Sequence, residues 1–491
     1  MTSSLVGSEM CIRDRLYTAL FLVVLASCHE NKFGVIDLTI DAPEGDNIDY
    51  VGDGLQHPCM LLTNEDFVYI NEKRAVEGNI QKKAFEWMTR SGNPYTQTTY
   101  QPTPVKYLAR LDATNWGAWN DRWVETGFNK NDFYEGIHAS YMNFSRDCAA
   151  AYAQAILWKL TGEVAYAQTS VKILNAWANT CKGYVTNKSG EFIDPNENLI
   201  ALEIYQIANA AELMRDYEGW SSGDFSKFKD WIVDVFYPFN TSFLAHKGES
   251  CPVHAWFNWD LANMTAILAI GILTDDNAKI NEALNYYKYL GSGSGFYLNG
   301  IPFTHPDPDS AEILGQCQES GRDQGHASLC VGMLSIFCKM ASNIGEDILA
   351  YGNYRALSMF EYYAKYNVGT SEVSGKDGKG WLMQGFKYTA SQVPYETLEK
   401  CTNTNSNATW PEISYEEKQA GNDTRGSSNP SWELVSRMAE DAGQSAIYSK
   451  MFRDVMRENS SRGYCDGGAG DYGPDSGGFD VFGWGSLLYA K

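Results

Sequence analysis

The stretch DCAAAYAQAILWKLTGEVAYAQTSVKILNAWANT, from Asp147 to Thr180, decides the fold of this 491-residue chain. Small and apolar residues recur at helical spacing on both sides of Thr161-Gly162. We therefore expect one helix over Asp147–Leu160 and a second over Glu163–Thr180, separated by a tight break. Two helices joined by so short a turn predict an antiparallel hairpin.

The same pattern recurs along much of the chain. Helices are expected at Leu202–Tyr217, Phe225–Phe239, Trp259–Leu273, Ala278–Leu290, Asp323–Ile344, Asp347–Tyr366 and Trp432–Ala442. Antiparallel pairs repeated in this way build an α/α toroid or a solenoid. We predict an all-α protein, an (α/α) toroid formed as an incomplete barrel of helix hairpins. The stretch from Gly369 to about Ser428 loses the period and is expected to be a long surface excursion.

The N-terminus has the pattern of an export signal. Arg13 and Arg15 precede an apolar run over 16–25, which is too short to span a bilayer and ends at Cys28. The ending Leu-Ala-Ser-Cys is similar to the bacterial lipoprotein box, in which Cys28 receives the lipid; the alternative is a chance cysteine after an apolar run. The residues before about Cys11 do not look like a natural signal start, so we interpret them as a scar.

These features divide the chain into three parts. Residues 1–28 are expected to be the scar and the signal peptide, residues 29–60 a polar linker with one short strand, and residues 61–491 a single toroid domain. No later run is apolar enough to cross a bilayer. We therefore expect a secreted protein that meets the membrane only through a lipid anchor, on the periplasmic or cell-surface face of a bacterial outer membrane. A monomer or a small homo-oligomer is expected.

Composition excludes some partners and favours others. The net charge of −22 argues against nucleic acid, because phosphate binding needs a basic surface. An anionic ligand must instead meet a local cluster of Arg, Lys and His. The 14 Trp and 30 Tyr suit the stacking of sugar faces, although core packing explains most of them. The 11 Cys include no CxxC pair, so a structural zinc site is not expected, and no other metal or cofactor is implied.

Ionisable residues are concentrated in Glu319-Ser320-Gly321-Arg322-Asp323-Gln324-Gly325-His326. On a continuous helix Glu319, Arg322, Asp323 and His326 would project from one face. Such a stripe beside an apolar helix is costly unless its members meet a ligand or one another. We expect it to form one wall of an active site, with an interhelical salt-bridge network as the alternative.

A second group lies at the start of the helix expected over Trp259–Leu273. His254 and Asn258 are four residues apart, and Trp259 follows. A helix-capping role would explain Asn258 alone and would leave His254 without a reason. Further candidates are His138, Tyr141, Tyr205 and Gln206, for which packing is the competing interpretation.

Arg, His and Asn without a close carboxylate pair suit β-elimination on a uronate. The C5 proton is weakly acidic because its removal adds negative charge to an existing carboxylate. An Arg or Asn that hydrogen-bonds this carboxylate stabilises the enolate-like state. A His or Tyr can then remove the proton while an acid protonates the departing O4.

Several ordered motifs resemble the alginate-lyase superfamily of polysaccharide lyases. The segments are Glu319–His326, Asn258–Leu261, the helix around Tyr205–Glu212, Asn115-Trp116 and the Gly-rich tail 478–489. The resemblance covers roughly residue 100 to the C-terminus. It implies a toroid with a groove for an acidic polysaccharide, alginate or a related uronan, and cleavage by metal-independent elimination.

Residue roles follow from the resemblance position by position. Arg322 would be the family's active-site arginine, and Asn258 with His254 would neutralise the uronate carboxylate. The family often has a catalytic Tyr seven residues after the Arg, where this chain has Leu329. The proton transfer would then fall to His326, Tyr205 or Tyr141, with Glu319 and Asp323 orienting their neighbours. Substrate contacts are expected from Glu319, Gln206, Trp259, Tyr141 and His138.

Two other functions are compatible with the sequence. One is a glycoside hydrolase on the same toroid, with Glu319 or Asp323 as the acid and a distant carboxylate as the base. The other is a lipoprotein that binds glycans without cleaving them. A lyase differs from both because its product carries a new C4–C5 double bond that absorbs ultraviolet light.

Overall fold

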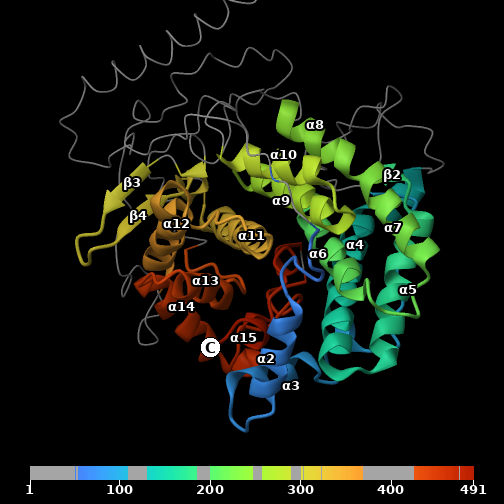
Figure 1. The fold of residues 1–491 in the computed structure, drawn as a ribbon, viewed down its shortest axis with the longest axis horizontal. Coiled ribbons are helices and arrows are strands. Elements are labelled where there is room, and N and C mark those ends of the chain that lie inside the picture. The colour runs from blue at the N-terminus through green and yellow to red at the C-terminus, as the bar shows by residue number, and fades with distance from the viewer. Residues whose placement is uncertain are drawn as a thin grey trace, which may run out of the picture.

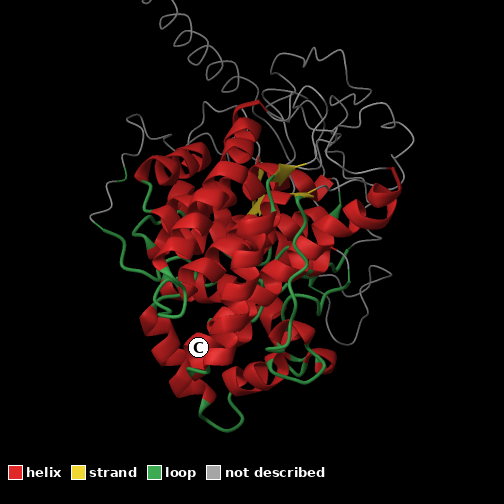
Figure 2. Ribbon diagram, turned by 90° about the vertical axis from the view of Figure 1, so that its right-hand side faces the viewer, coloured by secondary structure: helices red, strands yellow, loops and turns green. Residues whose placement is uncertain are grey.

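The computed structural model describes residues 50, 54–108, 130–184, 200–246, 257–288, 300–301, 303–321, 323–368, 425–474 and 476–491. Helices dominate these residues, as Figure 2 shows. The all-α prediction is confirmed, and most of the expected helices are present within a few residues of their predicted bounds.

The centre of the molecule is a layer of four inner helices. These are α4 (Lys130–Thr161), α6 (Ala201–Met214), α9 (Phe257–Thr274) and α11 (Gln324–Asn343), and each contacts the next in this order (Figure 1). Every residue of α6 is buried, as are almost all residues of α9. Most residues of both helices are apolar or small, as a helix covered on all sides requires. The polar exceptions in α6 are buried with hydrogen-bond partners: Glu203, Gln206, Asn209 and Glu212.

Outer helices cover this layer and bury one face only. They are α5 (Val164–Thr180), α7 (Ser222–Val235), α8 (Tyr237–His246) and α10 (Asn277–Lys288). The buried residues of α10 are Ile280, Ala283, Leu284 and Tyr287, the spacing of a single helical stripe. The α4–α5 hairpin predicted from the opening stretch is present. It turns at Gly162, whose φ of +74° is the left-handed conformation typical of a glycine that ends a helix.

The remaining helices complete a ring. They are α12 (Tyr351–Asn367), α13 (Trp432–Asp441), α14 (Ile447–Arg457) and α15 (Gly485–Leu488) near the C-terminus, with α2 (Asn64–Arg74) and α3 (Ile80–Met88) near the N-terminus. Contacts run from α11 to α13, on to α15 and α2, and back to α4 (Figure 1). The helix hairpins therefore form an (α/α) toroid that the N-terminal and C-terminal segments close. Helices α2, α3, α8, α14 and α15 were not predicted, and α4 begins at Lys130 instead of the expected Asp147.

Short strands and turns lie at the edges of the helices. Strands β1 (Tyr107–Leu108) and β2 (Gly183–Tyr184) pair in parallel, while β3 (Phe303–Pro306) and β4 (Ile313–Gln316) form an antiparallel hairpin packed on α12. His305 lies in β3, buried, with its Nε2 3.0 Å from Oε1 of Gln316 on β4.

The C-terminal segment fills the inside of the ring. Phe482 stacks on Tyr152 of α4, with ring centroids 3.8 Å apart, and meets Tyr205 of α6 edge-on at 4.5 Å. Its glycines allow close backbone approach: a Cβ on Gly468 would lie 2.0 Å from the Trp484 ring. The Gly-rich composition of this tail is therefore a packing requirement.

Buried thiols and one apolar helix need a structural interpretation. The seven cysteines that the structure describes are all free and buried, so no disulfide joins this part of the chain.

Within the same residues, α9 is the one helix long and apolar enough to cross a membrane by composition. Since α9 is buried inside the ring, we interpret it as a core helix.

A charged network ties the start of the described chain to the ring. His57 Nδ1 lies 2.6 Å from Glu212 Oε1 on α6, and its Nε2 lies 2.8 Å from Asp275 Oδ1 after α9. Arg215 also contacts Glu212, at 3.1 Å. Residues Pro58–Leu62 next to His57 are buried, so the last residues of the stretch expected to be a linker are packed in the core.

This network predicts a pH-dependent stability. Burial by itself would lower the pKa of His57, but its contacts with Cys59, Glu212 and Asp275 raise that pKa to about 10. A pKa higher in the folded state than in the unfolded state gives stability that is complete below about pH 6.5 and is lost as pH rises through 10. We expect the urea midpoint to fall over this range. In His57→Gln the fall of the midpoint with pH should be smaller. If the midpoint of the variant fell with pH as steeply as that of the parent, His57 could not be the group responsible.

Candidate functional site

The segment before α11 is not the single helix that the sequence predicted. Gln318–Gly321 form a short 3₁₀ turn, and Asp323 is extended, with φ −169° and ψ 166°. Helix α11 begins at Gln324, and Oδ1 of Asp323 accepts a hydrogen bond of 2.8 Å from the backbone N–H of His326. The predicted stripe through residues 319–326 is therefore wrong, because Asp323 caps a new helix instead of continuing an older one.

Asp323 also holds the His326 ring. Its second oxygen, Oδ2, lies 2.6 Å from Nδ1 of the imidazole. A carboxylate in this position favours the tautomer with the proton on Nδ1, so Nε2 carries the lone pair. The His326 side chain is 38% exposed, which leaves the ring accessible to a ligand. The expectation that Asp323 orients His326 agrees with these contacts.

Glu319 connects this segment to α9. Its side chain is fully buried, and Oε1 accepts a hydrogen bond of 3.3 Å from the backbone N–H of Asn258. A carboxylate at the first turn of a helix is stabilised by the unpaired N–H groups and the helix dipole there. The two segments singled out from the sequence are therefore neighbours, at the N-terminal ends of two adjacent inner helices.

Asn258 and Trp259 occupy the first turn of α9. Asn258 is the second residue of the helix, so it is not the helix cap. It is 1% exposed, and its Oδ1 is buried without a hydrogen-bond partner among the residues that the structure describes. Trp259 is half-buried, with its ring 5.9 Å from that of Phe243 on α8.

Three other candidates are in packed positions. Tyr205 is fully buried and its hydroxyl donates to the backbone carbonyl of Asp480 at 2.8 Å, while Gln206 donates to the carbonyl of Phe479. Burial raises the pKa of the Tyr205 hydroxyl well above its ordinary value. Tyr141 is also buried and donates to Glu203 Oε1 at 2.8 Å. These contacts fasten α6 to the C-terminal segment and to α4.

Other predicted residues lie outside the part of the chain that the structure describes. These are Arg322, His254 and the lipidation candidate Cys28, and for His138, which lies in α4, the side chain is not described. The described part of the candidate site therefore consists of Asn258, Trp259, Glu319, Asp323 and His326.

Helix α12 supports the start of α11 through contacts that the sequence did not suggest. The Tyr363 hydroxyl donates to the backbone carbonyl of Gln324 at 3.1 Å. Asn367 donates from its Nδ2 to Oε1 of Gln324 at 2.8 Å. Both residues lie in a helix whose sequence has the pattern of a buried core helix, so their spacing did not indicate a contact with the candidate site.

One group of potential metal ligands is present among the described residues. His57, Cys59 and Glu212 place a ring nitrogen, a sulfur and a carboxylate oxygen within 4.8 Å of one another. His57 is also bonded to Asp275, and Glu212 to Arg215 and the backbone N–H of Cys59. Because the charged groups satisfy one another, we assign this cluster to the ion-pair network of the fold.

The comparison with known families concerns the inner helices of the ring. An (α/α) toroid carries an Asp–His pair and a buried carboxylate at the ends of adjacent inner helices. Residues 93–290 match the model of the alginate lyase family, a span that includes α4, α6 and α9. Over these residues the chain is similar to the alginate lyase family, which supports a polysaccharide lyase. No curated protein matches its sequence significantly.

Solved structures of alginate lyases show a distant likeness. The enzyme A1-III from Sphingomonas species A1 shares 16% identity over 63% of this chain and 80% of its own, with a TM-score of 0.41. An alginate lyase from Bacteroides ovatus shares 12% identity over 67% of this chain and 87% of its own, with a TM-score of 0.43. A variant of the A1-III enzyme in complex with a tetrasaccharide shares 15% identity over 63% of this chain and 79% of its own, with a TM-score of 0.40.

Proposed function

We propose that the protein cleaves a uronic-acid-containing polysaccharide, alginate or a glucuronan, by β-elimination, with His326 as the base. The observation that carries this proposal is the Asp323–His326 contact of 2.6 Å on a partly exposed imidazole. A base for C5 must be accessible and fixed in one tautomer; the exposure of the ring provides the first property and the contact with Asp323 the second.

The carboxylate of Asp323 acts twice in this mechanism. Before the reaction it accepts a hydrogen bond from the Nδ1–H group, so that the lone pair of His326 is on Nε2, the atom available to the substrate. After proton transfer it stabilises the imidazolium. The imidazolium can then return the proton to O4 of the departing sugar, which completes the elimination without water or a covalent intermediate.

The uronate carboxylate needs a positive or hydrogen-bonding partner during the reaction. We assign this role to Arg322, which immediately precedes Asp323, and to Asn258 and His254 at the start of α9. Support comes from the contact between Glu319 and the backbone of Asn258, which fixes the two segments to each other. A bidentate Arg would stabilise the enolate-like state without a metal ion.

Tyrosine is not part of this proposal. The hydroxyls of Tyr141 and Tyr205 are buried and bonded to the protein, and Leu329 occupies the position where related enzymes often have Tyr. His326 is the described residue that combines a defined tautomer with exposure.

The test is the product formed from polyuronates by the purified protein. With alginate or polyglucuronate we expect a steady rise in ultraviolet absorbance from the new C4–C5 double bond, and none with a carboxyl-reduced polymer. New reducing ends without absorbance would indicate a hydrolase and contradict the proposal. Binding of a polyuronate without any product would favour a glycan-capturing protein.

A further inference from the structure

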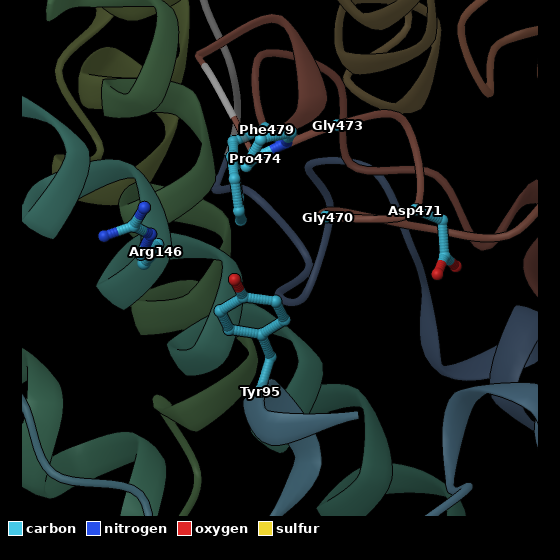
Figure 3. Close-up of a pocket in the computed structure, with 7 residues that line it drawn as sticks. All are labelled: Tyr95, Arg146, Gly470, Asp471, Gly473, Pro474 and Phe479. Carbon is cyan, nitrogen blue, oxygen red and sulfur yellow. The ribbon is translucent and has the colours of Figure 1, made fainter. Parts of the chain in front are cut away.

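A pocket of about 460 Å³ lies inside the ring beside α4 (Figure 3). Its walls are Tyr95 in the 3₁₀ turn η1 (Pro94–Thr96), Arg146 on α4, and, from the C-terminal segment, Gly470, Asp471, Gly473, Pro474 and Phe479. The carbonyl of Phe479 accepts the Gln206 amide, so the pocket adjoins the inner helix α6. Its size is within the range of sites for small ligands.

The charge inside this pocket is positive. Arg146 is half-buried, and among the residues that the structure describes it has no carboxylate partner. Asp471, the one carboxylate of the described wall, is turned away from Arg146 (Figure 3). It bonds Arg90 at 2.5 Å and the Trp87 indole N–H at 2.9 Å. A half-buried cation without a counter-ion is partly desolvated, and in a protein of net charge −22 it favours an anionic ligand.

The rest of the lining is suited to a sugar ring. Tyr95 and Phe479 meet edge to face, with ring centroids 5.5 Å apart. The hydroxyl of Tyr95 points toward Arg146 in Figure 3 and is hydrogen-bonded to its side chain; burial raises the pKa of Tyr95, so the hydroxyl keeps a proton that it can donate to a ligand. Gly470 lets the loop pass over Tyr95, since a Cβ there would lie 2.8 Å from the ring. A cation beside aromatic surface matches the carboxylate and the C–H face of a hexuronate.

We propose that this pocket binds one uronate unit of the polysaccharide, with its carboxylate on Arg146 and its ring against Tyr95 and Phe479. The identity of the sugar rests on the proposed function. The pocket lies on elements other than the Glu319–His326 segment, so it would be a second carboxylate position along the bound chain.

The experiment is calorimetric titration with a tetrasaccharide of glucuronate and with its carboxyl-reduced counterpart. Titrations in a His326→Ala background remove turnover. Arg146→Gln should weaken binding of the acidic tetrasaccharide about tenfold to a hundredfold, the change expected for a lost charge-assisted hydrogen bond, and leave the neutral one unchanged. Arg146→Lys keeps the charge but loses the planar guanidinium, so its affinity for the acidic tetrasaccharide should lie between those of the parent and of Arg146→Gln.

A matched control is Arg74→Gln. Arg74 is also partly buried without a carboxylate partner among the described residues, bonding the Leu160 carbonyl on the outside of the pocket. This variant should bind the acidic tetrasaccharide like the parent. Arg146→Gln could lower the melting temperature more than Arg74→Gln does. In that case the affinity of Arg146→Lys, which keeps the positive charge, shows whether the loss of binding comes from the charge or from the fold.

Two results would overturn the proposal. One is unchanged affinity of the Arg146 variants for the acidic tetrasaccharide. The other is an equal loss for the acidic and the neutral tetrasaccharide, which would mean that Arg146 supports the fold and does not read the carboxylate. Because binding is measured without cleavage, these results are separate from a failure of the elimination assay.

Discussion

Replacing His326 by alanine is expected to lower kcat on polyuronate by about 10²- to 10⁴-fold, the usual contribution of a positioned acid or base. The side chain is 38% exposed and contacts Asp323, so the variant should fold normally. The measurement is the rate of rise in ultraviolet absorbance at saturating substrate, with melting temperatures to confirm folding. Activity near the parent level would remove His326 from the proton transfer.

A companion pair of variants separates the two roles of Asp323. Asp323→Asn removes the negative acceptor from His326 while keeping a good helix cap, and we expect kcat to fall by a factor on the order of 10². The control is Asp276→Asn, since Asp276 caps α10 through the backbone N–H groups of Ala278 and Lys279 but contacts no histidine. Equal losses in both variants would mean that capping, and not catalysis, explains the effect.

Replacing Phe482 by alanine is expected to lower the free energy of unfolding by about 3–5 kcal/mol, the range for a large buried aromatic. Its ring stacks on Tyr152 and meets Tyr205, so truncation would leave a cavity between two inner helices and the tail. Urea unfolding followed by tryptophan fluorescence measures the change.

Val455→Ala is the control for this prediction. Val455 is 41% exposed on α14, and the same kind of truncation there should change stability by no more than about 0.5 kcal/mol. If Phe482→Ala also changed stability by less than 1 kcal/mol, the tail could not be part of the cooperative core.

Local signals in the sequence were enough for the helix hairpins. The pairs α4–α5 and α9–α10 have regular apolar spacing and a marked turn, Gly162 in one and Asp276 in the other. Helix α14 was missed although its apolar residues recur at helical spacing on one face. Only part of that face is covered: Phe452 and Met456 are buried, while Ile447, Met451 and Val455 are exposed.

The candidate site was harder to predict for two physical reasons. Asp323 starts a new helix, so the phase that would align Glu319 with His326 is lost at that residue. Helix α6 is buried on every side, so the spacing of Tyr205 and Gln206 could not separate a groove position from a packed one. The three-residue spacing of Asp323 and His326 was visible, but the contact between Glu319 and Asn258 depends on the ring bringing distant segments together.

Closure of the ring has a consequence for how such a protein can change over evolutionary time. Gln81 of α3 donates to the backbone carbonyl of Ala490, and the Tyr489 hydroxyl donates to that of Leu61, so the two ends of the described chain are joined. An open solenoid can gain or lose a repeat at either end and keep its remaining contacts. A closed ring cannot, since an added hairpin would separate these partners. New specificity in this architecture should therefore arise in the loops between helices, while the number of hairpins stays fixed.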